Sequence, residues 1–154
     1  MTGTPGTGKT RSVPDEASTP HLLSLFMADL ATLQIENLAK WFDGESELWL
    51  PHSGPTVGQR RILALFSLIF RRYKELSWEV GSVYPVGDCK LVYESESRGI
   101  FADGRPYANS ILTVIEFSPK GKIRFLSDYF KDTSIFGRFS PTPNGTSPKP
   151  VSYR

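Results

Sequence analysis

Residues 77–130, SWEVGSVYPVGDCKLVYESESRGIFADGRPYANSILTVIEFSPKGKIRFLSDYF, decide the fold. Along this stretch polar and apolar residues alternate with a period of two, which is typical of β-strands. Tight-turn pairs interrupt the alternation, and Asp-Gly at 103–104 is a strong hairpin signal. We therefore predict four consecutive antiparallel strands, over residues 77–86, 91–101, 107–117 and 123–130.

The chain before this stretch has helical spacing instead. Thr19-Pro20 offers an N-cap and an N1 proline for a first helix, and a second, short helix ends near Gly44. The longest helix is predicted over residues 56–74, and a short strand over 47–51 precedes it. Three N-terminal helices followed by an antiparallel meander indicate an α+β domain, with helices covering one face of a curved sheet.

Length and composition favour a single domain with two tails. The 154 residues fit one domain, which we place at residues 19–136. The segments 1–18 and 137–154 are rich in Gly, Pro, Ser and Thr, so we expect both tails to be disordered. Cys89 is the only cysteine and there are two histidines, which argues against a disulfide and a metal centre. We expect no metal and no cofactor.

The charge pattern excludes little by itself. The formal net charge is +2, and no concentrated basic face is visible, so we expect no nucleic-acid partner. No apolar run approaches the roughly 20 residues of a membrane-spanning helix, and the N-terminus lacks a signal pattern. The expected location is cytoplasmic, without membrane attachment.

One motif at the N-terminus suggests nucleotide binding. Residues Gly3 to Thr10, GTPGTGKT, match the phosphate-loop pattern GxxxxGKT. That motif needs a buried strand before it and a helix after it, which aim backbone N–H groups at the phosphates. Only Met1 and Thr2 come before the motif, and Pro14 follows closely. We therefore expect no bound nucleotide.

Short stretches in the strand region resemble a known superfamily. They are Leu91-Val92-Tyr93, Tyr107 with Ser110-Ile111-Leu112, and Gly121-Lys122-Ile123 leading into Asp128-Tyr129-Phe130. Together with the order of elements, they resemble the SnoaL-like and limonene-epoxide-hydrolase-like branch of the nuclear transport factor two-like (ketosteroid isomerase-like) superfamily. The resemblance implies a cone-shaped, curved antiparallel sheet wrapped around an apolar pocket and covered by the three helices.

The resemblance also implies a set of site residues. Asp128 matches a catalytic aspartate on the final strand, and Glu96 and Arg98 match an acid and an arginine on an earlier strand, in reversed order. Asp128 would act as general base, and Arg98 and Glu96 would assist it. The expected walls of the pocket are Asn109, Ile111, Thr113, Leu126, Phe130, Ile100, Leu48 and Leu50. Glu96 and Arg98 also fit the solvated face of a strand.

Three functions remain open at this stage. The first is a cofactor-independent isomerase, cyclase or dehydratase acting on a small apolar, polyketide- or terpenoid-like secondary metabolite. The second is an epoxide hydrolase that uses the same acids, although Leu48 and Leu50 stand where its relatives hold the attacking water. The third is a non-catalytic ligand-binding or dimerisation module. Leu112 and Val114, expected to face outward, favour a homodimer.

Overall fold

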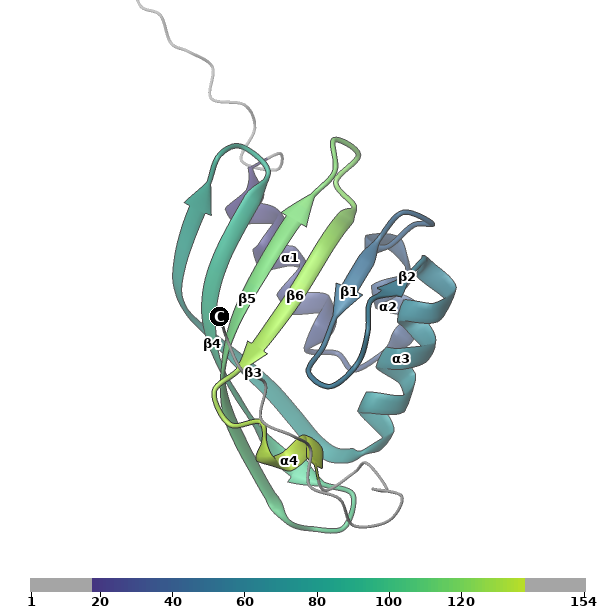
Figure 1. Cartoon of the computed structure of the whole chain (residues 1–154), viewed down its shortest axis with the longest axis vertical. Helices are drawn as coiled ribbons and strands as arrows, with labels where there is room; N and C mark the ends of the chain where they lie inside the picture. The colour runs from purple at the N-terminus through teal and green to yellow at the C-terminus, as the bar shows by residue number, and fades with distance from the viewer. Residues whose placement is uncertain (1–17, 138–154) are drawn as a thin grey trace, which may run out of the picture.

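Residues 18–137 of the computed structural model form a six-stranded sheet, with the helices that precede residue 73 on one side (Figure 1). The strand order in the sheet is β2-β1-β6-β5-β4-β3. The elements in chain order are α1 (Thr19–Leu30), α2 (Ile35–Leu38), the 3₁₀ helix η2 (Ala39–Trp41), β1 (Glu47–Trp49), β2 (Thr56–Val57), α3 (Gln59–Arg71), β3 (Tyr73–Val86), β4 (Lys90–Phe101), β5 (Pro106–Phe117), β6 (Ile123–Phe130) and α4 (Ser134–Gly137).

The predicted meander is present with small changes at its ends. Strands β3 to β6 pair antiparallel in sequence order. β3 begins at Tyr73, directly after α3, so the long helix is shorter than the sequence predicted. β1 pairs parallel with β6, so the sheet is mixed and not purely antiparallel. The predictions for the tails and for the phosphate-loop motif concern residues 1–17 and 138–154, which lie outside the described residues.

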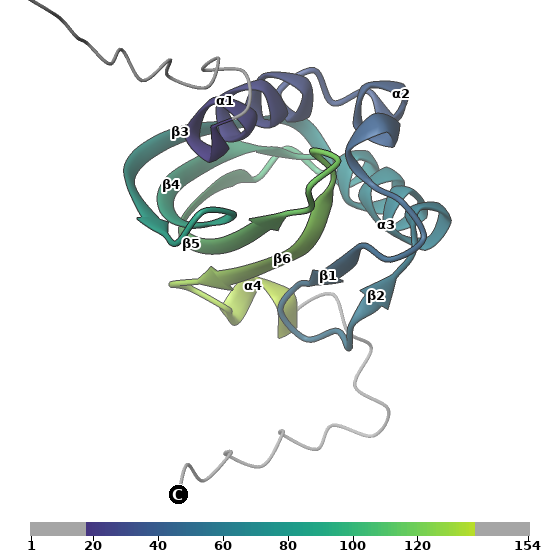
Figure 2. The same ribbon diagram turned by 90° about the horizontal axis from the view of Figure 1, so that it is seen from above.

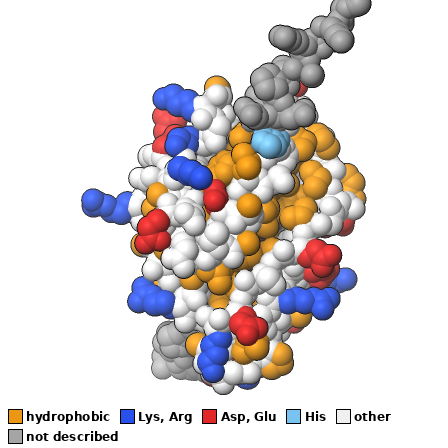
Figure 3. Space-filling model, turned by 180° about the vertical axis from the view of Figure 1, so that it is seen from behind, with side chains coloured by type: hydrophobic (Ala, Val, Ile, Leu, Met, Phe, Trp, Pro, Cys, Tyr) orange, Lys and Arg blue, Asp and Glu red, His pale blue; other side chains and the backbone are white. Residues whose placement is uncertain are grey.

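The helices α1, α2 and α3 lie over one face of the sheet, toward which the long strands bend, whereas α4 follows the end of β6 away from them (Figure 2). Ser18 caps α1 through its side chain, which accepts a hydrogen bond from the backbone N–H of His21. The core lies between α1, α3 and this inner face, where the edge-to-face rings of Phe26, Trp41 and Phe42 pack together. On the helix side, apolar side chains also reach the surface among scattered charges (Figure 3). Leu25 on α1 and Leu68 on α3 are exposed large apolar residues. Within residues 18–137, no helix has the length and apolar character that crossing a membrane requires.

Alternation sorts each strand into an inner and an outer face. On β4 the buried residues are Leu91, Tyr93, Ser95 and Ser97, whereas Glu94, Glu96 and Arg98 are exposed. On β5 the inner set includes Asn109, Ile111 and Thr113. The inner face of β4 is therefore the one without charged side chains, as the cost of burying charge requires.

Two of the three register shifts in the described part of the sheet bear on the placement of particular residues. A register shift near Phe117 puts Ile123 opposite Phe117 in the core and leaves Arg124 exposed, although simple alternation would place Arg124 on the same face as Asp128. A second shift lies between Tyr73 and Glu75. There the β3 backbone approaches Gly99 so closely that a Cβ at this position would lie 2.0 Å from the Glu75 carbonyl oxygen. Only glycine, which has no Cβ, fits at this close approach of β3 and β4.

Candidate functional site: a carboxyl in an apolar cavity beneath the helices

A small cavity of about 50 Å³ lies between the inner face of the sheet and the helices. The side chains around it are mostly aromatic and aliphatic. Its lining residues are Phe26, Met27, Leu30, Phe66, Trp78, Tyr93, Ser95, Ile111, Thr113, Leu126 and Asp128. Asp128 is the only charged residue in this lining. The space suits one or two waters or a small organic group.

Asp128 lies on β6 opposite Thr113 of β5. The Thr113 hydroxyl donates a hydrogen bond of 2.6 Å to Asp128 Oδ1. Loss of water around the carboxyl raises the pKa of Asp128 to about 6, and the Thr113 hydrogen bond partly opposes this shift. Asp128 is half-buried, and the apolar side chains around its carboxyl are what removes water from it. Its pKa thus lies close to neutrality, where a carboxyl can both accept and release a proton.

Tyr93 is the second titratable group in this cavity. It is 3% exposed, and its hydroxyl lies 3.7 Å from the Met27 sulfur, to which it donates. Burial raises the pKa of Tyr93, the nearby charge of Asp128 raises it further, and a hydrogen bond with Thr113 opposes both. Tyr93 therefore stays protonated near neutral pH.

The structure brings three of the predicted wall residues together with Asp128. Ile111, Thr113 and Leu126 are buried and line the cavity. Asn109 is also buried on the inner face, but its amide is already engaged. Its Nδ2 donates to the Asp132 carbonyl at 2.9 Å, and its Oδ1 accepts from the Asp132 N–H at 3.1 Å. Asn109 thus fixes the chain after β6, and its amide is not directed at a ligand.

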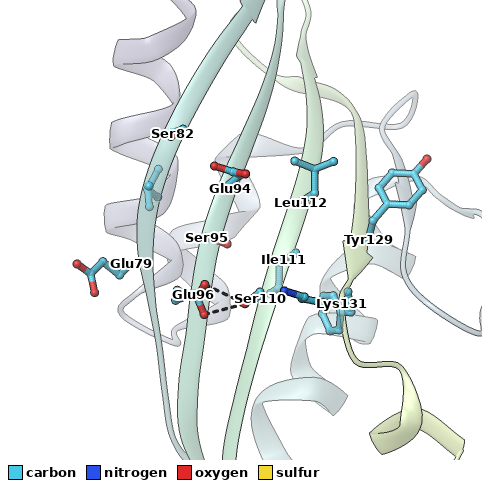
Figure 4. A pocket seen from close by; sticks show the side chains of 13 residues that line it. Glu79, Ser82, Glu94, Ser95, Glu96, Ser110, Ile111, Leu112, Tyr129 and Lys131 are labelled. Carbon is cyan, nitrogen blue, oxygen red and sulfur yellow. Dashed lines mark hydrogen bonds between the residues drawn. The ribbon is translucent and has the colours of Figure 1, made fainter.

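Glu96, Arg98 and Ile100 do not lie where the sequence analysis expected them. Alternation along β4 puts all three on the outer face, and Glu96 and Arg98 are exposed. Figure 4 shows Glu96 beside Ser110, whose hydroxyl donates to both carboxylate oxygens at 2.8 and 3.0 Å. Both side chains line a hollow of about 760 Å³ on the open side of the sheet, away from the helices. The expectation that Glu96 and Arg98 converge with Asp128 is therefore wrong. The residues of β4 that face inward are the ones next to them in sequence, at Tyr93, Ser95 and Ser97.

The remaining predicted residues lie at the edge of the site. Leu48 is fully buried in the core opposite Leu126, and it is not part of the cavity lining. Leu50 and Phe130 are half-buried and line a wider groove of about 610 Å³, which continues past the end of β1. Asp128 lines this groove as well as the small cavity. The site therefore has two neighbouring spaces that share one carboxyl.

Sequence reasoning missed Tyr93 as a site residue. One feature of the sequence could have found it, because the two faces of the predicted strand differ in charge. One face has no charged residue, with Leu91, Tyr93, Ser95 and Ser97. The other face carries Glu94, Glu96 and Arg98. Burial of three charges without partners costs far more than burial of serine and tyrosine. The lining residues from α1, α3 and β3 depend on tertiary packing and had no comparable signal.

Comparison with solved structures identifies the architecture. An NTF2-like protein from Anabaena variabilis matches with a TM-score of 0.66 and 20% identity, over 81% of this chain and 96% of that one. A protein from Shewanella denitrificans, named as a SnoaL-like polyketide cyclase, matches with a TM-score of 0.65 and 15% identity over 81% and 96%. This chain has the NTF2-like fold.

A third match adds a bound molecule. A protein from Catenulispora acidiphila with a ketosteroid isomerase-like fold, in complex with trimethylamine, matches the NTF2-like domain with a TM-score of 0.68 and 15% identity, over 78% of this chain and 92% of that one.

No family model matches the sequence, and no curated protein matches it. At these identities the matches establish the fold of the NTF2-like domain, and function is argued from its own site.

Proposed function

We propose that this protein is a cofactor-independent acid–base enzyme, of the isomerase, cyclase or dehydratase type, that acts on a small apolar molecule. One observation carries the proposal: the half-buried Asp128 carboxyl lines an apolar cavity, and loss of water around it raises its pKa to about 6. Near neutral pH it is largely ionised and able to take a proton from a bound carbon acid. Well-placed acid–base groups contribute about 10²- to 10⁴-fold in rate.

The chemistry requires no second acid from the outer face. Asp128 accepts the proton from the substrate, and the same group returns it at another position, as an isomerase needs. Thr113 holds one carboxyl oxygen and leaves the other for the substrate. The apolar walls exclude water, which strengthens the interactions of the carboxyl with a bound ligand.

The test is exchange of the α-protons of acetone in D₂O, followed by proton NMR. We expect the wild-type protein to accelerate exchange and Asp128→Asn to remove at least 90% of the acceleration. Glu96→Gln is the matched control, because Glu96 lies on the outer face. Exchange that survives Asp128→Asn, or fails equally in Glu96→Gln, contradicts the assignment. The rate should rise with pH and level off above about 6, because only the ionised carboxyl acts as a base.

An epoxide hydrolase is the less favoured enzyme reading. Such a reaction needs polar groups that hold water, and the two positions that the resemblance gives this role are apolar: Leu48 is buried in the core outside the cavity lining, and Leu50 lines the wider groove. Incubation with propylene oxide in heavy-oxygen water decides it, because a hydrolase places the label in the diol. We expect no enzyme-dependent labelled diol.

A second candidate is a non-catalytic site for a small organic cation. The cavity lining combines one carboxyl with the rings of Phe26, Phe66, Trp78 and Tyr93, and it has no Lys, Arg or His. Aromatic faces and a carboxylate together attract alkylammonium ions. The complex of a structurally similar protein with trimethylamine supports this candidate. Calorimetric titration tests this candidate by comparing the affinity for trimethylammonium chloride with that for neutral tert-butanol. A cation site binds trimethylammonium more tightly than tert-butanol, and Asp128→Asn removes this preference.

We also propose that two copies pair through the open side of the sheet. Leu112 and Tyr129 expose 40% and 58% of their surface there, although both are large apolar or aromatic groups. Sedimentation should show a dimer that Leu112→Glu disrupts and that Leu25→Glu, a comparably exposed position on α1, leaves intact. A wild-type monomer at high concentration contradicts the pairing.

A further inference from the structure

The chain after β6 is tied to the inner face of the sheet by the Asn109 side chain. Its Nδ2 donates to the Asp132 carbonyl oxygen at 2.9 Å, and its Oδ1 accepts from the Asp132 N–H at 3.1 Å. The Asp132 carboxylate in turn accepts from the N–H and the hydroxyl of Ser134, the first residue of α4, at 2.9 and 2.6 Å. Asn109 therefore fixes the point from which α4 begins.

Beneath α4 lies an apolar cluster that is separate from the main core. Leu76, Phe101 and Tyr107 are its buried members, and Ile135 of α4 packs against it. The rings of Phe101 and Tyr107 meet edge to face, with their centroids 5.3 Å apart. Residues 131–134 are exposed and Ile135 is partly buried, so this side chain is the apolar anchor of the segment.

The cluster beneath α4 is continuous with the cavity of Asp128. Trp78 lines this cavity and also packs against the cluster. Along the inner face of β5, Ile111 lines the cavity, Asn109 comes next and Tyr107 belongs to the cluster. Apolar side chains therefore lead from the cavity to the place that Ile135 covers.

We propose that residues 131–137 form a lid with Asn109 as its latch, and that the cluster beneath it is the outer part of a ligand channel to Asp128. The closed cavity of about 50 Å³ has room for only a small group. With the lid open, an elongated apolar molecule places one end at Asp128 and the other on the rings of Phe101 and Tyr107. This inference deepens the proposed function, on which the catalytic use of the channel rests.

The contacts that hold the lid are few and exchangeable. A helix of four residues has almost no stability of its own, so α4 depends on the Asn109 latch and on Ile135. Water replaces a broken hydrogen bond, so release of Asp132 from Asn109 is only modestly unfavourable. The released amide offers one acceptor and two donor hydrogens to a polar group of the ligand, in place of the Asp132 backbone. Thr133 lines the groove that Asp128 also lines, so movement of this segment also widens that groove.

The experiment locks the lid of the full chain with a disulfide. The Lys131 N–H donates to the Ser110 carbonyl oxygen at 2.9 Å, so the antiparallel course of β5 and β6 continues to residues 109 and 132. Facing positions of this kind suit a disulfide. The protein carries Asn109→Cys and Asp132→Cys together with Cys89→Ser, which removes the native thiol. Diamide oxidises the pair to the disulfide, and dithiothreitol reduces it again.

The probe is N-phenyl-1-naphthylamine, a neutral apolar molecule whose fluorescence rises when it leaves water. In stopped-flow fluorescence the reduced protein should bind it at least about tenfold faster than the oxidised protein, because only the reduced lid opens. In the native background, Asn109→Ala should speed binding about tenfold, since the loss of two hydrogen bonds raises the open population by that order.

Asn37→Ala is the matched control. The Asn37 amide also fixes a turn, by donating to the Thr32 hydroxyl at 3.0 Å, but this turn follows α1. This variant should bind the probe at the wild-type rate. Equal acceleration in Asn37→Ala and Asn109→Ala would reflect general loosening and would refute the latch.

Two other results overturn the lid. One is an equal binding rate in the oxidised and the reduced protein, and the other is the absence of probe binding in every reduced protein. Ile135→Ser removes the apolar anchor and should also speed binding, and it replaces the double-cysteine protein if that protein does not fold or cross-link. Failure of the acetone test with lid-dependent probe binding refutes the proposed function alone, whereas Asp128-dependent exchange without it refutes only this inference.

Discussion

Asp128 and Glu96 are both carboxyl side chains on neighbouring parts of one sheet, yet they lie in opposite environments. Asp128 is on the inner face among Leu126, Phe26 and Trp78, with a single side-chain hydrogen bond from Thr113. Glu96 is on the outer face in water, opposite Glu79 and beside Ser110. The same chemical group thus has a raised pKa among apolar side chains on one face and is surrounded by water on the other. The comparison teaches that the face of the sheet, more than the residue type, determines the environment of a carboxyl.

The largest expected effect comes from the placement of one charge on each face. Ile115 is fully buried on the inner face, and its neighbour Glu116 is on the outer face. Ile115→Lys should lower the free energy of unfolding by at least about 4 kcal/mol or prevent folding, because the ammonium has no partner in the core. Glu116→Lys should change it by less than about 0.5 kcal/mol. Urea denaturation checks both, and similar losses in the two variants would contradict the assignment of faces.

A smaller effect is expected at Asp128 itself, with a definite dependence on pH. The folded pKa of about 6 exceeds the ordinary value of 3.8, so the folded state binds more protons between these values and stability falls as pH rises through this window. Above pH 6 the penalty approaches about 3 kcal/mol, because a pKa difference of one unit corresponds to about 1.4 kcal/mol. Asp128→Asn should therefore stabilise the protein at pH 7 by about that amount and remove the slope between pH 4 and 6.

Thermal unfolding across this pH range measures the Asp128 effect. Glu96→Gln serves as the outer-face control and should leave the slope unchanged. A variant Asp128→Asn that is less stable than wild type at pH 7 would show that the carboxyl is stabilised, and not strained, by its surroundings.

The smallest expected effect concerns a serine on the inner face of β4. Ser97 is 1% exposed, and its hydroxyl oxygen has no hydrogen-bond partner of normal geometry within the described residues, although it is near enough to Tyr107 to lower the pKa of that group. Ser97→Ala should be neutral or stabilising by up to about 1 kcal/mol, since it removes a buried polar atom. The outer-face comparison is Ser110→Ala, which removes the hydrogen bonds to Glu96 and should cost less than about 0.5 kcal/mol. Chemical denaturation resolves the two, and a clear loss in Ser97→Ala would indicate a bound water at that oxygen.

The sequence predicted most of the fold and pointed to one residue of the candidate site. The period-two pattern located strands β3 to β6 to within a few residues, because alternation along a half-buried strand is local. Asp128 stood out among apolar neighbours, and the structure places it in the cavity with Ile111, Thr113 and Leu126. For β4 the sequence analysis assigned the wrong face to the pocket. Glu96 and Arg98, expected in the pocket, are therefore exposed to solvent. A slip of one residue inverts every side chain of a strand.

The sequence by itself determined the order of helices and strands, the turns between the strands, and the presence of an acidic residue at an otherwise apolar strand end. Only the tertiary structure decided which face of each strand is covered. That choice depends on how α1 and α3 pack against the sheet and on the register shifts at Phe117 and Tyr73. The reason is physical: periodicity arises from neighbours along the chain, whereas the pKa of Asp128 arises from the exclusion of water by side chains distant in sequence.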